Sequence, residues 1–87
     1  MERIEKEVIV NNSQGLHARP AALFVQIAQG FDSSVKLEKD GRIVDGKSII
    51  AVLSLGISKG VKVRLIIEGE DAKEAFSQLK NFLEKNA

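Results

Sequence analysis

The single histidine of the chain lies in a segment suited to accepting phosphate. His17 stands in the sequence GLHARP at residues 15–20, and Pro20 is tolerated in the first turn of a helix. His17 is therefore predicted at a helix N-terminus, where unpaired N–H groups and the positive dipole end stabilise an anion. The guanidinium group of Arg19 can donate bidentate hydrogen bonds to phosphate oxygens. The helix dipole favours a neutral, nucleophilic imidazole. A histidine that only starts the helix, with an incidental arginine nearby, fits the same residue types.

A serine opens the second segment of interest. Ser48 precedes an apolar run that ends at Gly56, which predicts a short helix over residues 48–55 with Ser48 as its N-cap. Capping alone accounts for a serine at this position. A phosphate on Ser48 is also compatible with the fold, because the helix dipole favours negative charge there.

The same short helix carries more apolar residues than one buried face can hold. Ile49, Ile50 and Leu53, together with Val52 and Leu55, surround most of its circumference. Small domains commonly expose some apolar residues. A cluster of them beside His17 also fits a surface that docks partner proteins.

Hydrophobic periodicity predicts four strands and three helices in the order β-α-β-β-α-β-α. Apolar residues that alternate along the chain indicate strands, and a period of 3.6 indicates helices. The predicted strands are residues 4–10, 34–38, 43–44 and 61–68, and the predicted helices are residues 20–29, 48–55 and 71–83. Short strands and helices in this order predict an α+β sandwich of two layers, with all helices on one face of the sheet.

Three local signals mark the ends of these elements. Asp40-Gly41 between two strand-like runs predicts a tight hairpin in which both residues have positive φ. Gly30 is predicted to end the first helix in a left-handed conformation. Asp71 and Glu74 have the spacing of a capping box that opens the last helix.

Composition excludes several functional classes. With 87 residues, 44% apolar and 29% charged, the chain is expected to form one soluble domain. A net charge of +1 argues against nucleic-acid binding, and one histidine without cysteines argues against a metal centre. No apolar stretch reaches the ~18 residues of a membrane span. The charged N-terminus lacks a signal-peptide core, so a cytoplasmic location is expected.

Two motifs in register resemble one known family. GLHARPA at residues 15–21 and GKSIIAVLSLGI at residues 46–57 are similar to HPr, the histidine-containing phosphocarrier family of the bacterial phosphoenolpyruvate:sugar phosphotransferase system. The resemblance covers essentially the whole chain and implies a single HPr-like domain over residues 1–87. It implies an open-faced sandwich with a four-stranded antiparallel sheet and three helices on one face.

The resemblance also implies roles for the two motif residues. Enzyme I, charged by phosphoenolpyruvate, would phosphorylate His17 on Nδ1, and the group would pass to IIA domains of sugar permeases. Arg19 would stabilise the phosphoryl group during transfer. Such a protein is a phosphoryl carrier rather than a stand-alone catalyst. No cofactor is expected, and nothing in the sequence requires more than a monomer.

Docking and regulation follow from the same resemblance. The implied partner-docking residues are Ala22, Phe24, Ile49, Ile50 and Leu53. In firmicute-type members, the serine that matches Ser48 is phosphorylated by an HPr kinase/phosphorylase, and the product binds a catabolite-control transcription regulator. Residues 44–46 depart from the Asn-containing loop often found before this serine.

The sequence leaves open two alternatives to a phosphocarrier for sugar uptake. One is a regulatory module of catabolite repression that acts only through the serine, which residues 18–26 and 37–41 also resemble. Retention of His17 favours the carrier. The other is the related carrier of nitrogen-type phosphorelays, which shares the histidine chemistry.

Overall fold

The computed structural model describes residues 1–85, and these residues form the elements in the predicted order. Strands and helices alternate as β-α-β-β-α-β-α. The elements are β1 (Glu2–Ile9), α1 (Ala18–Gln29), β2 (Ser34–Lys39), β3 (Arg42–Asp45), α2 (Ile49–Ser54), β4 (Lys62–Gly69) and α3 (Ala72–Glu84).

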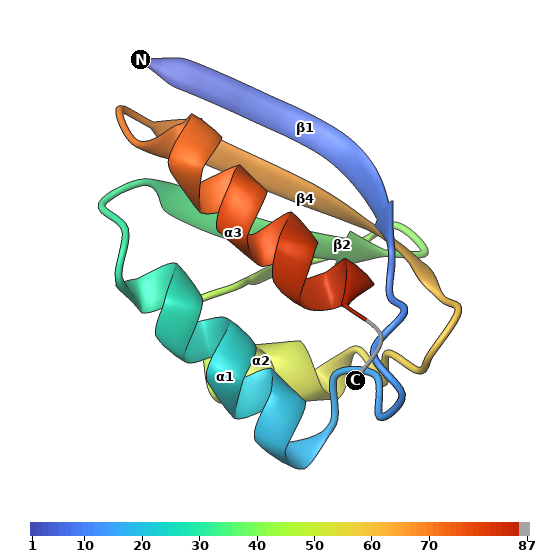
Figure 1. Ribbon diagram of the computed structural model, residues 1–87. Coiled ribbons are helices and arrows are strands. Elements are labelled where there is room, and N and C mark those ends of the chain that lie inside the picture. The colour runs from blue at the N-terminus through green and yellow to red at the C-terminus, as the bar shows by residue number, and fades with distance from the viewer. Residues whose placement is uncertain (86–87) are drawn as a thin grey trace.

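The four strands form one antiparallel sheet in the order β1-β4-β2-β3. β4 lies between β1 and β2, so that Ile67 pairs with Ile4 on one side and with Val35 on the other. The helices lie together on one face of this sheet (Figure 1). The predicted α+β open-faced sandwich is confirmed. The order of the strands did not follow from periodicity.

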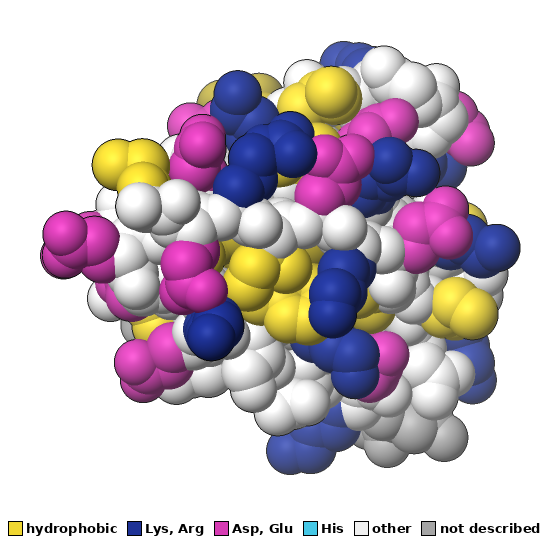
Figure 2. All heavy atoms as spheres, turned by 90° about the horizontal axis from the view of Figure 1, so that it is seen from above, with side chains coloured by type: hydrophobic (Ala, Val, Ile, Leu, Met, Phe, Trp, Pro, Cys, Tyr) yellow, Lys and Arg dark blue, Asp and Glu magenta, His cyan; other side chains and the backbone are white. Residues whose placement is uncertain are grey.

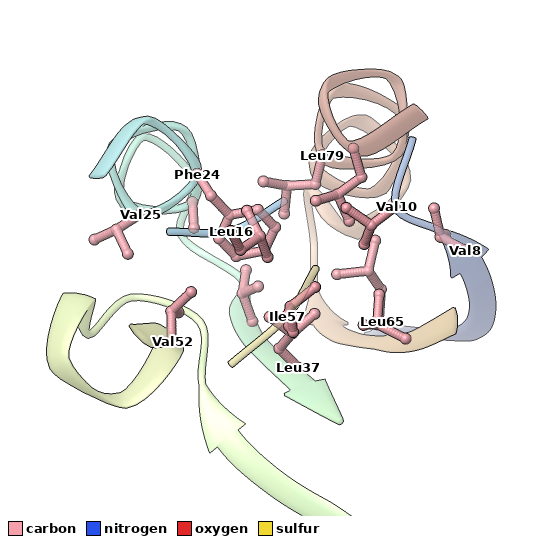
Figure 3. Packing of buried hydrophobic residues seen from close by; sticks show 14 of the residues in the cluster. Val8, Val10, Leu16, Phe24, Val25, Leu37, Val52, Ile57, Leu65 and Leu79 are labelled. Atoms are coloured by element: carbon pink, nitrogen blue, oxygen red, sulfur yellow. The ribbon is translucent and has the colours of Figure 1, made fainter. Parts of the chain in front are cut away.

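The hydrophobic core fills the space between the sheet and the helices. Phe24 and Leu16 lie at its centre, and Val52 points toward them from α2 (Figure 3). Leu37 and Leu65, which face each other across β2 and β4, close the core from the sheet side. This packing fixes α1 and α2 beside each other on the sheet.

The predicted hairpin is confirmed, and the predicted end of the first helix is wrong. Asp40 and Gly41 have φ values of 53° and 83°, as a tight turn between two strands requires. Gly30 has a φ of −75° and is not left-handed. Its N–H donates to the carbonyl of Ile27 at 3.1 Å, because the last turn of α1 tightens and stays right-handed.

Asp71 does not form the predicted capping box. Its side chain makes no bond to the start of α3, and its carboxylate accepts the N–H groups of Asp32 and Ser33, both at 2.9 Å, and the Ser33 hydroxyl. The Ser33 hydroxyl and then the Asp32 N–H hold the pKa of Asp71 below its usual range. The carboxylate ties the loop between α1 and β2 to the start of α3, a contact across 38 residues that local sequence does not reveal.

The face shown in Figure 2 mixes charges of both signs. Lysine and arginine side chains alternate with aspartate and glutamate around an apolar area, and no histidine is visible there. On the helix-free side of the sheet, Arg64 pairs with Glu5 at 2.8 Å, and this pairing lowers the pKa of Glu5.

Within residues 1–85, the helices are too short and too polar to cross a membrane.

Candidate functional site

His17 occupies the N-cap of α1, as predicted. Its backbone is extended, with φ −109° and ψ 155°, and its exposed side chain makes no capping hydrogen bond. The carbonyl of His17 accepts the N–H of Ala21 at 3.4 Å. The N–H groups of Ala18 and Arg19 precede that bond and have no acceptor within the helix. The imidazole therefore stands beside free amide donors at the positive end of a helix of 12 residues.

The first turn of α1 is held in a strained shape. Ala18 has a φ of 40°, a left-handed conformation that costs a residue with a side chain about 1–2 kcal/mol. Pro20 is buried in the same turn, where its missing N–H costs no hydrogen bond. Arg19 lies between them and is exposed. The turn thus exposes His17 and Arg19 and buries Pro20.

Two contacts set α1 and α2 antiparallel. Directly before His17, the N–H of Leu16 donates to the carbonyl of Ile57 at 2.9 Å, just beyond the C-terminal end of α2. At the other end, Nε2 of Gln29 donates to the carbonyl of Lys47 at 3.1 Å, just before α2 begins. His17 thus lies by the end of α2, and Ser48 lies near the end of α1, about 18 Å along the axis of α1.

Ser48 is the N-cap of α2, which confirms the structural part of its prediction. Its Oγ accepts the N–H of Ala51 at 3.3 Å, and its own N–H donates to the carbonyl of Asp45 at 3.2 Å. Lys47 turns away and donates from Nζ to the carbonyl of Phe31 at 2.7 Å. Ser48 is half-buried, with its hydroxyl at the exposed end of a helix that has no charged residues.

The exposed apolar residues of the two helices form what we call the α1–α2 patch. It consists of Ala22, Leu23, Ile49, Ile50 and Leu53.

One predicted docking residue does not belong to this patch. Phe24 is fully buried in the core, so its prediction as a docking residue is wrong. Its exposed neighbour is Leu23. One residue along a helix rotates a side chain by about 100°, so Leu23 and Phe24 point in different directions.

The two segments that carry this patch lack acidic residues, a feature that the net charge does not show. Residues 8–31 and 46–67 contain no aspartate or glutamate, yet they include Arg19, Lys47 and Lys59. Lys39 and Arg42 add two cations that bind the last carbonyls of α2, Lys39 to Leu55 at 3.1 Å and Arg42 to Ser54 at 3.0 Å. A count of acidic residues along the sequence would have shown this asymmetry.

The fold and the site together define a small α+β protein with an exposed histidine at the N-cap of a helix. The model of the family described as the PTS HPr component phosphorylation site matches residues 4–85. The chain belongs to the PTS HPr family. Among residues 1–85, no three acidic or histidine side chains converge in a way that could hold a metal ion.

Relatives of two kinds resemble the chain. The HPr-like protein Crh of Halalkalibacterium halodurans is 50% identical over 82 residues, which cover 94% of this chain and 98% of that protein. The phosphocarrier protein HPr of Borreliella burgdorferi is 40% identical over 81 residues, which cover 93% of this chain and 94% of that protein.

The similar solved structures also include both HPr and Crh proteins. The crystal structure of HPr from Bacillus anthracis superposes with a TM-score of 0.92 at 42% identity, covering 95% of this chain and 99% of that chain. A crystal structure of Bacillus subtilis Crh, described as a domain-swapped dimer, gives a TM-score of 0.76 at 48% identity, covering 93% of both chains. Sequence identity alone does not separate the two kinds.

Proposed function

We propose that this chain is a phosphocarrier that accepts a phosphoryl group from phosphorylated enzyme I on Nδ1 of His17 and passes it to IIA domains of sugar permeases. The observation that carries the proposal is the exposed imidazole at the N-cap of α1, next to two amide N–H groups without an acceptor in the helix. This arrangement stabilises the negative charge that a phosphorylated histidine acquires.

The transfer requires little chemistry from the protein itself. The neutral Nδ1 uses its lone pair to form a bond to phosphorus, while the bond between phosphorus and the donor breaks and its electron pair stays with the donor. In this proposal, Arg19 and the N–H groups at the start of α1 balance the charge on the phosphoryl oxygens. The reverse sequence delivers the group to the acceptor, so the chain is a carrier and not a stand-alone catalyst.

The α1–α2 patch is the surface on which we place enzyme I and IIA domains in turn. Its apolar side chains lie on the two helices that hold His17 and Ser48. The carboxylate-free segments around it favour partners with acidic rims, because opposite charges steer encounter and suppress wrong partners. Arg19, two residues after His17, is the cation nearest to it in the sequence.

A second candidate function is regulation of catabolite repression through a phosphate on Ser48. Two Crh proteins are 50% and 48% identical to this chain, and a structure of one of them is described as catabolite repression HPr. A phosphate on Ser48 would sit on the N-cap oxygen of α2, where the helix dipole favours its charge. The fold would tolerate it, and the docking surface would change.

The experiment is an intact-mass measurement after incubation with phosphoenolpyruvate and enzyme I, followed by acid. The carrier function predicts a gain of one phosphoryl group that acid removes, and no gain for His17→Ala. Absence of a gain in the wild-type chain refutes it. Enzyme I of a nitrogen-type phosphorelay then tests that branch of the family. An HPr kinase/phosphorylase with ATP, using Ser48→Ala as the control, tests the regulatory function.

The remaining expectations concern the state of the protein. We propose that it works as one domain over residues 1–87, in the cytoplasm, as a monomer and without a cofactor. Solved structures of Crh and of an HPr from Thermoanaerobacter tengcongensis are described as dimers. Light scattering across a concentration series tests the monomer directly.

A further inference from the structure

At Gly15, the turn that carries His17 packs directly against the backbone that follows α2, which leaves no room for a side chain. A Cβ added at Gly15 would lie 2.4 Å from the carbonyl oxygen of Ile57 and 2.8 Å from the Cα of Ser58. Both atoms are backbone atoms, so they cannot swing aside as the end of a side chain can. Gly15 is also left-handed, with a φ of +61°.

A hydrogen bond and the core fix the same contact. The N–H of Leu16 donates to the Ile57 carbonyl at 2.9 Å, and the side chains of Leu16 and Ile57 are fully buried. Leu16 precedes His17 directly, and Ile57 lies two residues after Leu55, the C-cap of α2. We call this contact of residues 15–16 with residues 57–58 the backbone junction.

We propose that the backbone junction positions His17 for phosphoryl transfer, with Gly15 and Ile57 as positioning residues that never touch the phosphoryl group. The inference rests on the phosphocarrier function and deepens it. The junction sets the place of the imidazole relative to the end of α2, on which the donor docks. Loss of the contact moves the reacting nitrogen relative to a correctly docked donor.

The effect belongs to the chemical step and not to docking. A misplacement of about 1 Å costs on the order of 100-fold in rate. The Gln29–Lys47 bond and the shared core still hold together the two helices of the α1–α2 patch, which binds the donor. We therefore expect the kcat of phosphoryl transfer from enzyme I to fall, while the KM of enzyme I for this chain changes little. A variant that merely loosens the fold would not separate the two constants in this way.

The first test compares Gly15→Ala with Gly41→Ala. Gly41 has a φ of +83° and nothing within 4 Å of an added Cβ, so its variant shares the backbone strain but makes no collision. We expect kcat to fall at least ~10-fold for Gly15→Ala and less than ~2-fold for Gly41→Ala, at temperatures where circular dichroism shows both folded. Hydrogen exchange of the Leu16 N–H is expected to speed up only in Gly15→Ala. A folded Gly15→Ala with the kcat of the wild-type chain overturns the proposal.

A second pair of variants decides the question if Gly15→Ala does not fold. Ile57→Val and Ile67→Val each remove one carbon from a fully buried isoleucine, at the junction and in β4 respectively. The proposal expects a lower kcat at unchanged KM for Ile57→Val alone. Equal kcat values for the two variants overturn it. If the wild-type chain itself takes no phosphoryl group, the carrier function has failed, and the exchange of the Leu16 N–H still reports whether the junction holds.

Discussion

Replacing Ile50 by alanine separates partner binding from folding. Ile50 lies on α2, a helix of six residues, and is 79% exposed. The substitution removes three carbons, each worth about 0.8 kcal/mol when buried, and most of that burial can occur only on docking. We expect binding of enzyme I to weaken by about 2 kcal/mol, or about 30-fold in Kd. The free energy of unfolding of the free chain changes by less than about 0.5 kcal/mol.

Two control variants bracket this result. Ile43 is 54% exposed but lies in β3 opposite Glu38, on the helix-free face of the sheet, so Ile43→Ala is expected to leave the Kd unchanged. Val52 is buried on the core side of α2. Val52→Ala leaves a cavity and is expected to cost about 2 kcal/mol of stability, or roughly 8–16 °C in Tm, with normal binding below that temperature.

The assay is isothermal titration calorimetry of each unphosphorylated variant against enzyme I, with thermal unfolding of each variant alone. The reasoning is refuted if Ile50→Ala binds as tightly as the wild-type chain. It is also refuted if Ile43→Ala weakens binding equally, because the α1–α2 patch would then not be the docking surface.

Further predictions concern Ser48 and Asp71. Ser48→Ala removes the acceptor for the Ala51 N–H and is expected to lower the free energy of unfolding by about 1 kcal/mol, measured by urea denaturation; an unchanged midpoint contradicts the capping role. Ser48→Asp is expected to slow transfer from enzyme I in a stopped-flow assay without unfolding the chain, and an unchanged rate argues against regulation at this helix. The folded pKa of Asp71 is lowered, so its stabilisation is complete above about pH 4 and is lost as the pH falls through the folded value. Urea denaturation from pH 7 to pH 2 is therefore expected to show the stability advantage over Asp71→Asn shrinking with acid, and a constant advantage contradicts this account.

Local signals in the sequence were sufficient for the elements and for the place of His17. Asp40-Gly41 predicted a turn whose geometry depends on those two residues alone, and Ser48 predicted the N-cap that it forms. His17 falls at the start of α1 because Pro20 is confined to a first helical turn. These features are decided within a few residues of the chain.

Long-range contacts account for what the sequence did not reveal. Asp71 has the spacing of a cap, yet its carboxylate finds three donors in residues 32 and 33, which a local rule cannot weigh. Gly15 shows no sign in the sequence that the backbone of Ile57 lies against it. Phe24 and Leu23 are equally apolar neighbours, and only the packing of α1 on the sheet decides which is buried.

The bond between phosphorus and His17 is the most direct test of the account. The wild-type chain, labelled with nitrogen-15 in histidine, is incubated with phosphoenolpyruvate and enzyme I and studied by nitrogen-15 and phosphorus-31 NMR. The account predicts a nitrogen–phosphorus coupling at Nδ1 of His17, the only histidine of the chain. A phosphoryl group on Nε2, on a serine oxygen, or on no residue at all contradicts it.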